Sequence, residues 1–233
     1  MFYSIISAHD LSAQLSTKNC AVLDATYGIP NYPEAALTNM TNGRIAGAQF
    51  FDIDDIADPT APYAHTLPTP DVFAAKVGGL GIGNDDTVFI YDQNGLSFAA
   101  ARAWWMFRAM GHDKVAVLDG GLPAWRAAGL PLETGPLQQP TAKTFIAHYR
   151  PALYRSFEQI EDGGDTVLDA RAAPRFDAVV HTMDGDRVPA HIEGSYNTPF
   201  QNLLDASGAM FSSKEKLREQ LGAYLDKPSL VCS

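Results

Sequence analysis

The chain has 233 residues, of which 46% are hydrophobic, and a formal net charge of −10 at pH 7. This length suits two domains of roughly 100 to 150 residues, and the hydrophobic share can fill their cores, which argues against a disordered chain. The negative charge argues against a nucleic-acid partner, because contacts to phosphates need clustered Lys and Arg.

In the first half of the chain, short apolar runs alternate with helical stretches. The runs predict strands that are buried on both faces, at 21–23, 87–91 and 115–118. The helices expected around them cover 9–15, 71–77, 98–110 and 123–128. Thr69 and Pro70 form a typical helix start, and Trp104 and Trp105 predict that helix 98–110 packs deep against the sheet.

The second half repeats the alternation after a different kind of segment. Residues 129 to 150 are rich in Pro, Gln and Thr, show little periodicity and are predicted to contain the interdomain linker. Beyond them we expect helices at 156–160 and 214–224 and strands at 166–168 and 229–232. Alternating strands and helices predict an α/β fold with a doubly wound, mainly parallel sheet.

The two halves also share sequence. The segment AVLDA at 21–25 recurs as TVLDA at 166–170, an offset of 169 − 24 = 145 positions. RIAG at 44–47 returns as HIEG at 191–194 with an offset of 147, and 86–92 aligns with 227–233 with an offset of 141. Repeats of this length predict two copies of one domain. The expected division is a domain at 1–135, a linker at 136–150 and a domain at 151–233.

Other signals bear on location and on metals. No apolar run approaches the roughly 20 residues that a membrane span needs, so no membrane partner is expected. The first residues lack the basic flank and long apolar region of a secretory signal, which favours the cytoplasm. Cys20 and Cys232 make neither a disulfide framework nor a zinc site, and Cys20 is best interpreted as a small buried hydrophobe.

Ligands of an open parallel sheet bind at the carboxyl ends of its strands. The polar residues expected there are Asp24, Asp92, Asp119, Asp169 and the pair Cys232 and Ser233. No His or Glu at helical spacing joins these aspartates, so a metal cluster is not predicted. Capping of the following helix or turn is the better interpretation for Asp24, Asp119 and Asp169.

Several longer motifs occur in a recognisable order. They are GRIAGA at 43–48 followed by FFDID at 50–54, PYAHTLP at 62–68, WWMFR at 104–108, LDGGLPAW at 118–125, DARAAPRF at 169–176 and HIEGSYN at 191–197. This order resembles the tandem-domain rhodanese family of sulfurtransferases, and within it the mercaptopyruvate branch. The resemblance covers nearly the whole chain.

The resemblance implies two rhodanese-like domains, each a mainly parallel sheet flanked by helices. The first domain is inactive, and the second carries a cysteine on the loop after its central strand, where backbone amides and a helix N-terminus stabilise a thiolate. The thiolate takes sulfur from a small anionic donor, 3-mercaptopyruvate or thiosulfate, and the persulfide passes it to cyanide or a thiol. The thiol acceptor would be a thioredoxin-like protein or a low-molecular-weight thiol, and no metal or organic cofactor is implied.

The family's nucleophile is placed in this sequence by the repeat. In the first domain its position is taken by Asp92, which agrees with an inactive copy. In the second domain the count falls on Ser233, which leaves three alternatives. The nucleophile is the position just beyond Ser233, or serine has replaced it, or Cys232 serves instead. The second domain is therefore expected to be truncated here at its active-site loop.

The resemblance also implies residues that bind and process the donor. Arg175 matches the arginine that holds the donor's carboxylate, and Arg187 is close enough to supply a second one, whose family position is Asp184 here. Asp54 and His65 match residues beside the catalytic loop and would relay protons as pyruvate leaves.

Two other functions stay open at this point. One is a catalytically inactive rhodanese-like module that binds a partner or a small anion. The other, more remote, is a phosphatase, which would need a longer loop and an arginine after the cysteine.

Overall fold

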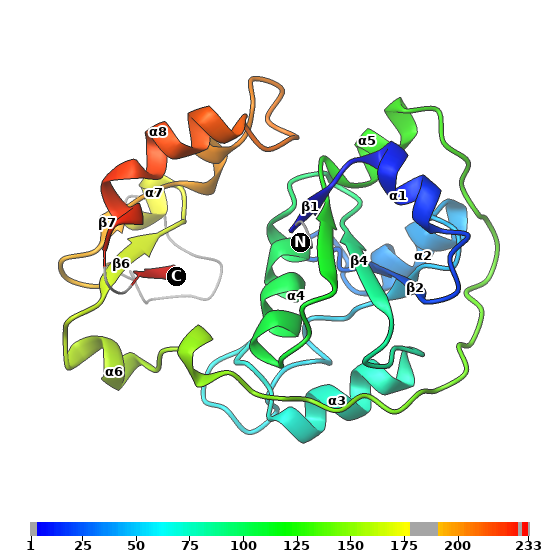
Figure 1. Ribbon diagram of the computed structural model, residues 1–233, viewed down its shortest axis with the longest axis horizontal. Coiled ribbons are helices and arrows are strands. Elements are labelled where there is room, and N and C mark those ends of the chain that lie inside the picture. Colours follow the sequence, from blue (N-terminus) through cyan, green and yellow to red (C-terminus); the bar gives the residue numbers. More distant parts are fainter. Residues whose placement is uncertain (1–3, 178–190, 228–229, 233) are drawn as a thin grey trace. The chain divides into compact units, whose positions relative to one another are not determined.

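The computed structural model describes residues 4–177, 191–227 and 230–232. The chain divides into two compact units, Met1–Leu153 and Tyr154–Ser233. Each unit has its own parallel sheet (Figure 1). No helix in the described part of the chain has both the length and the apolar character to cross a membrane.

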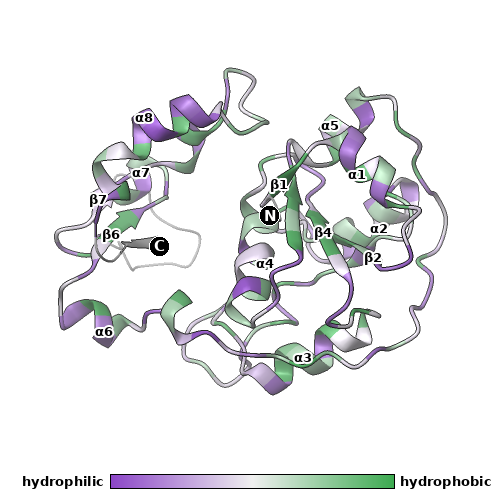
Figure 2. Cartoon of the chain, viewed as in Figure 1, coloured by the Kyte–Doolittle hydropathy of each residue, from purple (hydrophilic) through white to green (hydrophobic). Residues whose placement is uncertain are grey.

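The first unit contains a five-stranded sheet in the order β1-β5-β4-β2-β3, with all pairs parallel. The strands are β1 (Ile5–Ile6), β2 (Cys20–Asp24), β3 (Gln49–Phe50), β4 (Thr87–Tyr91) and β5 (Val115–Leu118). The predicted strands 87–91 and 115–118 are confirmed at these bounds. The central strands β2, β4 and β5 are mainly apolar because both of their faces are covered (Figure 2).

Helices cover the two faces of this sheet (Figure 1). They are α1 (Ala8–Gln14), α2 (Glu34–Asn42), α3 (Pro70–Gly79), α4 (Phe98–Ala109) and α5 (Gly121–Ala127), with a short 3₁₀ helix η1 (Pro151–Leu153). Leu23 and Ile90 point into a core with α3 and α4, while Val22 and Phe89 point into a second core with α1, α2 and α5. Alternate residues of each strand thus fill opposite layers.

The helix starts follow local capping chemistry. Ser7 accepts a hydrogen bond from the Asp10 amide at the start of α1, and Thr69 accepts one from the Val72 amide ahead of Pro70 in α3. The prediction that α4 packs deep against the sheet is confirmed, but its tryptophans are not the reason. Four alanines, Met106 and Phe107 form its buried face, whereas Trp104 and Trp105 are only half-buried. A face of alanines lets the helix backbone approach the sheet closely.

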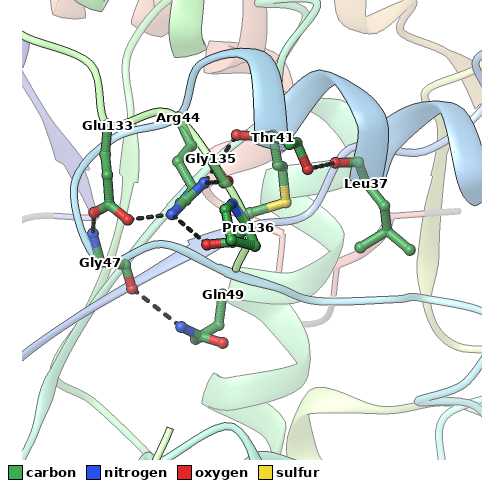
Figure 3. A network of polar contacts seen from close by, with 9 residues as sticks. Leu37, Thr41, Arg44, Gly47, Gln49, Glu133, Gly135 and Pro136 are labelled. Carbon is green, nitrogen blue, oxygen red and sulfur yellow. Dashed lines mark hydrogen bonds and ion pairs between the residues drawn. The ribbon is translucent and has the colours of Figure 1, made fainter. Parts of the chain in front are cut away.

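The segment predicted as a linker packs along the first unit. Phe145 is buried in the core beside Phe73 and Phe107, and the main chains of Arg44 and Glu133 pair as an antiparallel bridge. The Arg44 guanidinium is buried, donates to the Gly135 carbonyl at 2.7 Å and also pairs with Glu133 (Figure 3). The Glu133 carboxylate in turn accepts the Gly47 amide at 2.9 Å. This network fixes the start of the segment to the loop before β3.

The second unit is smaller. It contains α6 (Phe157–Glu161), β6 (Thr166–Asp169), α7 (Ala173–Phe176), β7 (Tyr196–Asn197), η2 (Phe200–Leu203), α8 (Lys214–Leu225) and β8 (Leu230–Cys232). Its parallel sheet has the order β7-β6-β8. Figure 2 shows hydrophilic residues along much of α8, and none of its residues is buried in the described structure. Among the side chains described in this unit, Val167, Leu168 and Leu204 are the buried hydrophobic ones.

The second sheet repeats the middle of the first. Leu23 of β2 pairs with Gln49 of β3, and the equivalent Leu168 of β6 pairs with Tyr196 of β7, which reproduces the 147-residue offset of the motif before them. On the other side, Leu23 pairs with Ile90 and Leu168 pairs with Cys232. The structure therefore relates β4 to β8 by an offset of 232 − 90 = 142 positions. The sequence alignment of 86–92 with 227–233 has an offset of 141, which is one less.

Candidate functional site

Three aspartates in the loop after β3 have separate tasks. Asp52 forms the turn: its carboxylate accepts the Asp54 amide at 3.0 Å and the Tyr32 hydroxyl. Asp55 pairs with Lys76 of α3. Because Asp52 makes the turn, the side chain of Asp54 is available for another partner.

That partner is His65. Its Nε2 lies 2.6 Å from Asp54 Oδ1 and 2.9 Å from the hydroxyl oxygen of Tyr27. The side chain of His65 is 36% exposed and that of Asp54 is 50% exposed, so both can reach solvent or a ligand. The structure thus brings together the two residues for which proton transfer is expected, and a carboxylate beside an imidazole is a suitable acid–base pair.

His65 is also held through its main chain. Its φ of 61° lies in the left-handed region, which is unfavourable for a side chain with a Cβ. The Arg102 guanidinium, from the first turns of α4, donates to the His65 carbonyl and stacks over Trp105 at 4.5 Å. These contacts compensate for the strained backbone and fix the direction of the imidazole.

Tyr27 and Arg102 were not among the residues expected from the sequence. Tyr27 follows the end of β2, three residues after Asp24, and so lies at the edge of the sheet where ligands bind. That position was the available signal. Nothing in the sequence around Arg102 indicates its contact with His65, which is 37 residues away.

The loop after β4 surrounds Asp92. Its side chain is completely buried, and Oδ1 accepts the Gly95 amide at 2.8 Å. Burial, together with the nearby Asp24 carboxylate, raises the pKa of Asp92 to about 6, although the hydrogen bond from the Gly95 amide lowers it. The loop after β4 is therefore filled by the side chain of Asp92.

Asp24 acts as the expected capping residue. Its Oδ1 accepts the Thr26 amide at 3.0 Å and its Oδ2 accepts the Gln93 side-chain amide at 2.8 Å. Burial raises its pKa, and these hydrogen bonds oppose the rise. Within residues 4–177, 191–227 and 230–232, no group of three or more His, Cys, Asp or Glu is placed to hold a metal ion.

Cys20 lies at the amino end of β2, away from the edge where these residues gather. It is partly buried rather than fully buried. Burial and the neighbouring Asp86 carboxylate raise the pKa of its thiol to about 11, so it stays protonated at neutral pH. A thiol in this state is a poor nucleophile.

In the second unit, Arg171 binds the carboxylate at the end of β6. Its Nε lies 2.9 Å from both oxygens of Asp169, and its own amide donates to Oδ1 at 2.9 Å. Although burial raises the pKa of Asp169, the hydrogen bonds from Arg171 hold it below its usual range. Arg171 therefore has a structural role within this unit.

Arg175 differs from Arg171. It lies on α7 with an exposed side chain, and no other described side chain or carbonyl pairs with its guanidinium. His191 donates from Nδ1 to the Phe176 carbonyl at 3.1 Å and stacks on the Phe176 ring, which closes the end of α7. Arg187 falls outside the described residues, as does Ser233. For Cys232 the backbone is described in β8, opposite Leu168.

Comparisons with known proteins agree with this architecture. Residues 7–128 match the rhodanese-like domain family. The chain is 38% identical to human 3-mercaptopyruvate sulfurtransferase, over 95% of this chain and 76% of that protein. It is 36% identical to thiosulfate/3-mercaptopyruvate sulfurtransferase 2 of Arabidopsis thaliana, over 96% and 73%.

Among solved structures, the chain resembles SseA from Escherichia coli, described as a 3-mercaptopyruvate sulfotransferase. The TM-score is 0.83, with 30% identity over 98% of this chain and 87% of that one. The chain spans about three quarters of the length of the two sequence relatives named above. The fold described above is therefore shared with a solved structure over nearly the whole chain.

Proposed function

This chain belongs to the rhodanese family of sulfurtransferases, and from that membership we propose that it transfers sulfur from 3-mercaptopyruvate, or from thiosulfate, to a thiol or cyanide. The transfer passes through a cysteine persulfide. The observation that carries the proposal is the repeated sheet. β8 lies beside β6 as β4 lies beside β2, so the second unit has a position after β8 that is equivalent to that of Asp92 after β4.

The register of β8 supports one position for the nucleophile. Cys232 pairs with Leu168 as Ile90 pairs with Leu23, so Cys232 is the residue equivalent to Ile90. Ile90 lies inside β4, two residues before Asp92. The position equivalent to Asp92 is then the one that follows Ser233. We assign the nucleophilic cysteine to that position, and Cys232 to a place within the strand.

The chemistry of 3-mercaptopyruvate calls for a proton carrier. Attack of the thiolate on the donor's thiol forms an S–S bond, and the C–S bond breaks with its electron pair going to the enolate of pyruvate. The proton on sulfur must be removed and a proton must reach the methylene carbon, so none is consumed overall. With thiosulfate, sulfite leaves with the electron pair and no proton moves.

His65 and Asp54 are suited to that proton transfer. The carboxylate fixes the imidazole at 2.6 Å, and both side chains are partly exposed. The pair would take the proton from sulfur and return one to the enolate, which is general acid–base catalysis. This role predicts a larger effect of its loss with 3-mercaptopyruvate than with thiosulfate.

Arg175 would bind the donor's carboxylate. A guanidinium offers two parallel N–H donors to a planar carboxylate, and that of Arg175 is not engaged by any other described residue. Arg187 would supply a second cation to the same anion. Such local positive charge is needed because the chain as a whole carries −10.

The acceptor would be a low-molecular-weight thiol or a thioredoxin-like protein, and the cytoplasm stays the predicted location. One relative, thiosulfate/3-mercaptopyruvate sulfurtransferase 1 of Arabidopsis thaliana, is described as mitochondrial. Cell fractionation with an antibody to the chain tests the location directly.

The test of the function is intact-mass spectrometry of the full-length protein after incubation with 3-mercaptopyruvate. We expect a gain of one sulfur atom, located by peptide mapping at the cysteine after Ser233, with release of one pyruvate. Cyanide should then remove the sulfur as thiocyanate. A protein that gains no sulfur from either donor would instead be the inactive module that binds a partner or a small anion.

A further inference from the structure

One nitrogen of His65 has two hydrogen-bonding partners of different kinds. Nε2 lies 2.6 Å from a carboxylate oxygen of Asp54 and 2.9 Å from the phenol oxygen of Tyr27. Both distances are within hydrogen-bonding range, but an N–H points in one direction and favours one acceptor. The two partners therefore suit two protonation states of the same atom.

When Nε2 carries a hydrogen, Asp54 is the better partner. It is charged, its distance is shorter, and it can only accept. When Nε2 presents a lone pair, Asp54 no longer has a donor there, whereas the Tyr27 hydroxyl can donate to it. The carboxylate of Asp54 is half exposed, so water can replace the hydrogen bond that it loses.

The Tyr27 ring is held in place by contacts with two other rings. It forms T-shaped contacts with the His65 ring, with centroids 5.0 Å apart at 75°, and with the Tyr32 ring, with centroids 4.8 Å apart at 70°. The Tyr32 hydroxyl donates to Asp52, and burial together with Asp52 raises the pKa of Tyr32, so it remains a donor. Because Asp52 also accepts the Asp54 amide, Tyr27 and Asp54 are linked by a second path that does not pass through His65.

We infer that Tyr27 is a positioning residue for His65, whose hydroxyl stabilises the imidazole with its lone pair on Nε2. This inference rests on the proposed function for its catalytic consequence, but not for the hydrogen bond itself. In the exchange, Nδ1 accepts a proton while Nε2 releases its own through the half-exposed Asp54 carboxylate to water, so Asp54 ends charged and cannot donate to Nε2. The imidazole ends neutral with its hydrogen on Nδ1, and the Tyr27 hydroxyl donates to the vacated Nε2. The ring changes its tautomer without turning.

The experiment uses Tyr27→Phe, which removes the hydroxyl and keeps the ring. Full-length protein labelled with ¹⁵N-histidine is examined by long-range proton–nitrogen correlation at neutral pH, with His65 assigned from a His65→Gln variant. We expect the fraction of the Nε2–H tautomer to rise. In parallel, kcat with 3-mercaptopyruvate should fall about tenfold with KM within twofold, while turnover with thiosulfate is unchanged.

Tyr63→Phe is the matched control, because Tyr63 lies in the loop that carries His65 and its side chain is 69% exposed. It should change neither the tautomer nor turnover. An unaltered tautomer in Tyr27→Phe would overturn the inference, and so would equal losses with both donors, which indicate a structural role. A changed tautomer with no change in turnover supports the hydrogen bond from Tyr27 and counts against the relay in the proposed function.

Discussion

The buried carboxyl of Asp92 gives the most direct test of the electrostatics of the first unit. Asp92→Asn keeps an oxygen that can accept the Gly95 amide and removes the ionisable group. At neutral pH the wild-type side chain is ionised although it is completely buried and close to Asp24. The variant should therefore relieve an electrostatic cost that the native unit bears.

The magnitude follows from linkage. The pKa of Asp92 is about 6 in the folded state against 3.8 for an ordinary aspartate, because burial and Asp24 disfavour the charge. Below pH 3.8 the group is protonated in both states, and the stabilising effect of its raised pKa is fully present. That stability is lost as pH rises through about 6. At 1.36 kcal/mol per pKa unit, the loss is about 3 kcal/mol.

The assay is urea unfolding of wild type and Asp92→Asn at pH 4 and pH 7, followed by tryptophan fluorescence. Trp104, Trp105 and Trp125 are the chain's tryptophans, and all three belong to the first unit, so the signal reports on it. At pH 4 an unfolded aspartate is already partly ionised, so this range captures most but not all of the effect. The free energy of unfolding of the variant minus that of wild type should be about 2 kcal/mol higher at pH 7 than at pH 4.

Comparing two pH values cancels costs of the new amide that do not depend on pH. Asp85→Asn, an exposed site in the same unit, is the control and should show no such difference. If the advantage of Asp92→Asn were the same at both pH values, the buried charge would not be the cause, and the reasoning would be refuted.

Four further outcomes are expected. Arg175→Ala should raise KM for 3-mercaptopyruvate about 30-fold, or roughly 2 kcal/mol, because a carboxylate loses its partner. His65→Ala should lower turnover with 3-mercaptopyruvate more than with thiosulfate, since only the former donor needs a proton moved. Arg44→Ala should cost the first unit about 3 kcal/mol in urea unfolding, because buried carbonyls and Glu133 lose their donor. Amides of α8 should exchange with deuterium faster than those of α4, which buries six residues.

Each of these has an outcome that contradicts it. An unchanged KM in Arg175→Ala would remove that residue from the donor site, with Arg218→Ala on α8 as the exposed control. Equal losses with both donors in His65→Ala would argue against proton transfer there. Arg126→Ala, also exposed, should leave stability unaltered, and an equally stable Arg44→Ala would show that the buried network contributes nothing. Uniform protection of both helices would contradict the difference in burial.

How much of the fold could be predicted depended on the length of each element. Strands 87–91 and 115–118 were predicted at their bounds because they are continuous apolar runs buried on both faces. β1, β3 and β7 have two residues each, too few to show any periodicity, and their pairing with neighbouring strands defines them.

The helix α2 was missed for a different reason. Its sequence contains two Thr and two Asn, which are weak helix formers, and Pro33 at its start makes no side-chain cap. Burial of Ala36 and Met40 stabilises it instead, and Met40 packs in the core that includes Val22 and Phe89 of the sheet. Tertiary packing of this kind cannot be predicted from local propensity.

The candidate site shows the same limit. His65 and Asp54 are 11 residues apart, and only the resemblance pointed to them together. Tyr27 is 38 residues from His65, so its hydrogen bond depends on how the loops after β2 and β3 meet at the sheet edge. Three aspartates within four residues look alike in sequence, and only the turn that Asp52 makes distinguishes Asp54.

Comparison of the two units separates scaffold from site. Asp24 and Asp169 occupy equivalent strand ends, and each accepts the amide two residues later, at 3.0 and 2.9 Å. Arg44 and His191 begin equivalent motifs, and each donates to the carbonyl near the end of the preceding helix, at 3.1 Å in both cases. Contacts that recur after duplication, with different side chains at the second pair, serve the fold. The His65 pair is described only in the first unit and the unengaged Arg175 only in the second, so their substitution should change sulfur transfer without unfolding either unit.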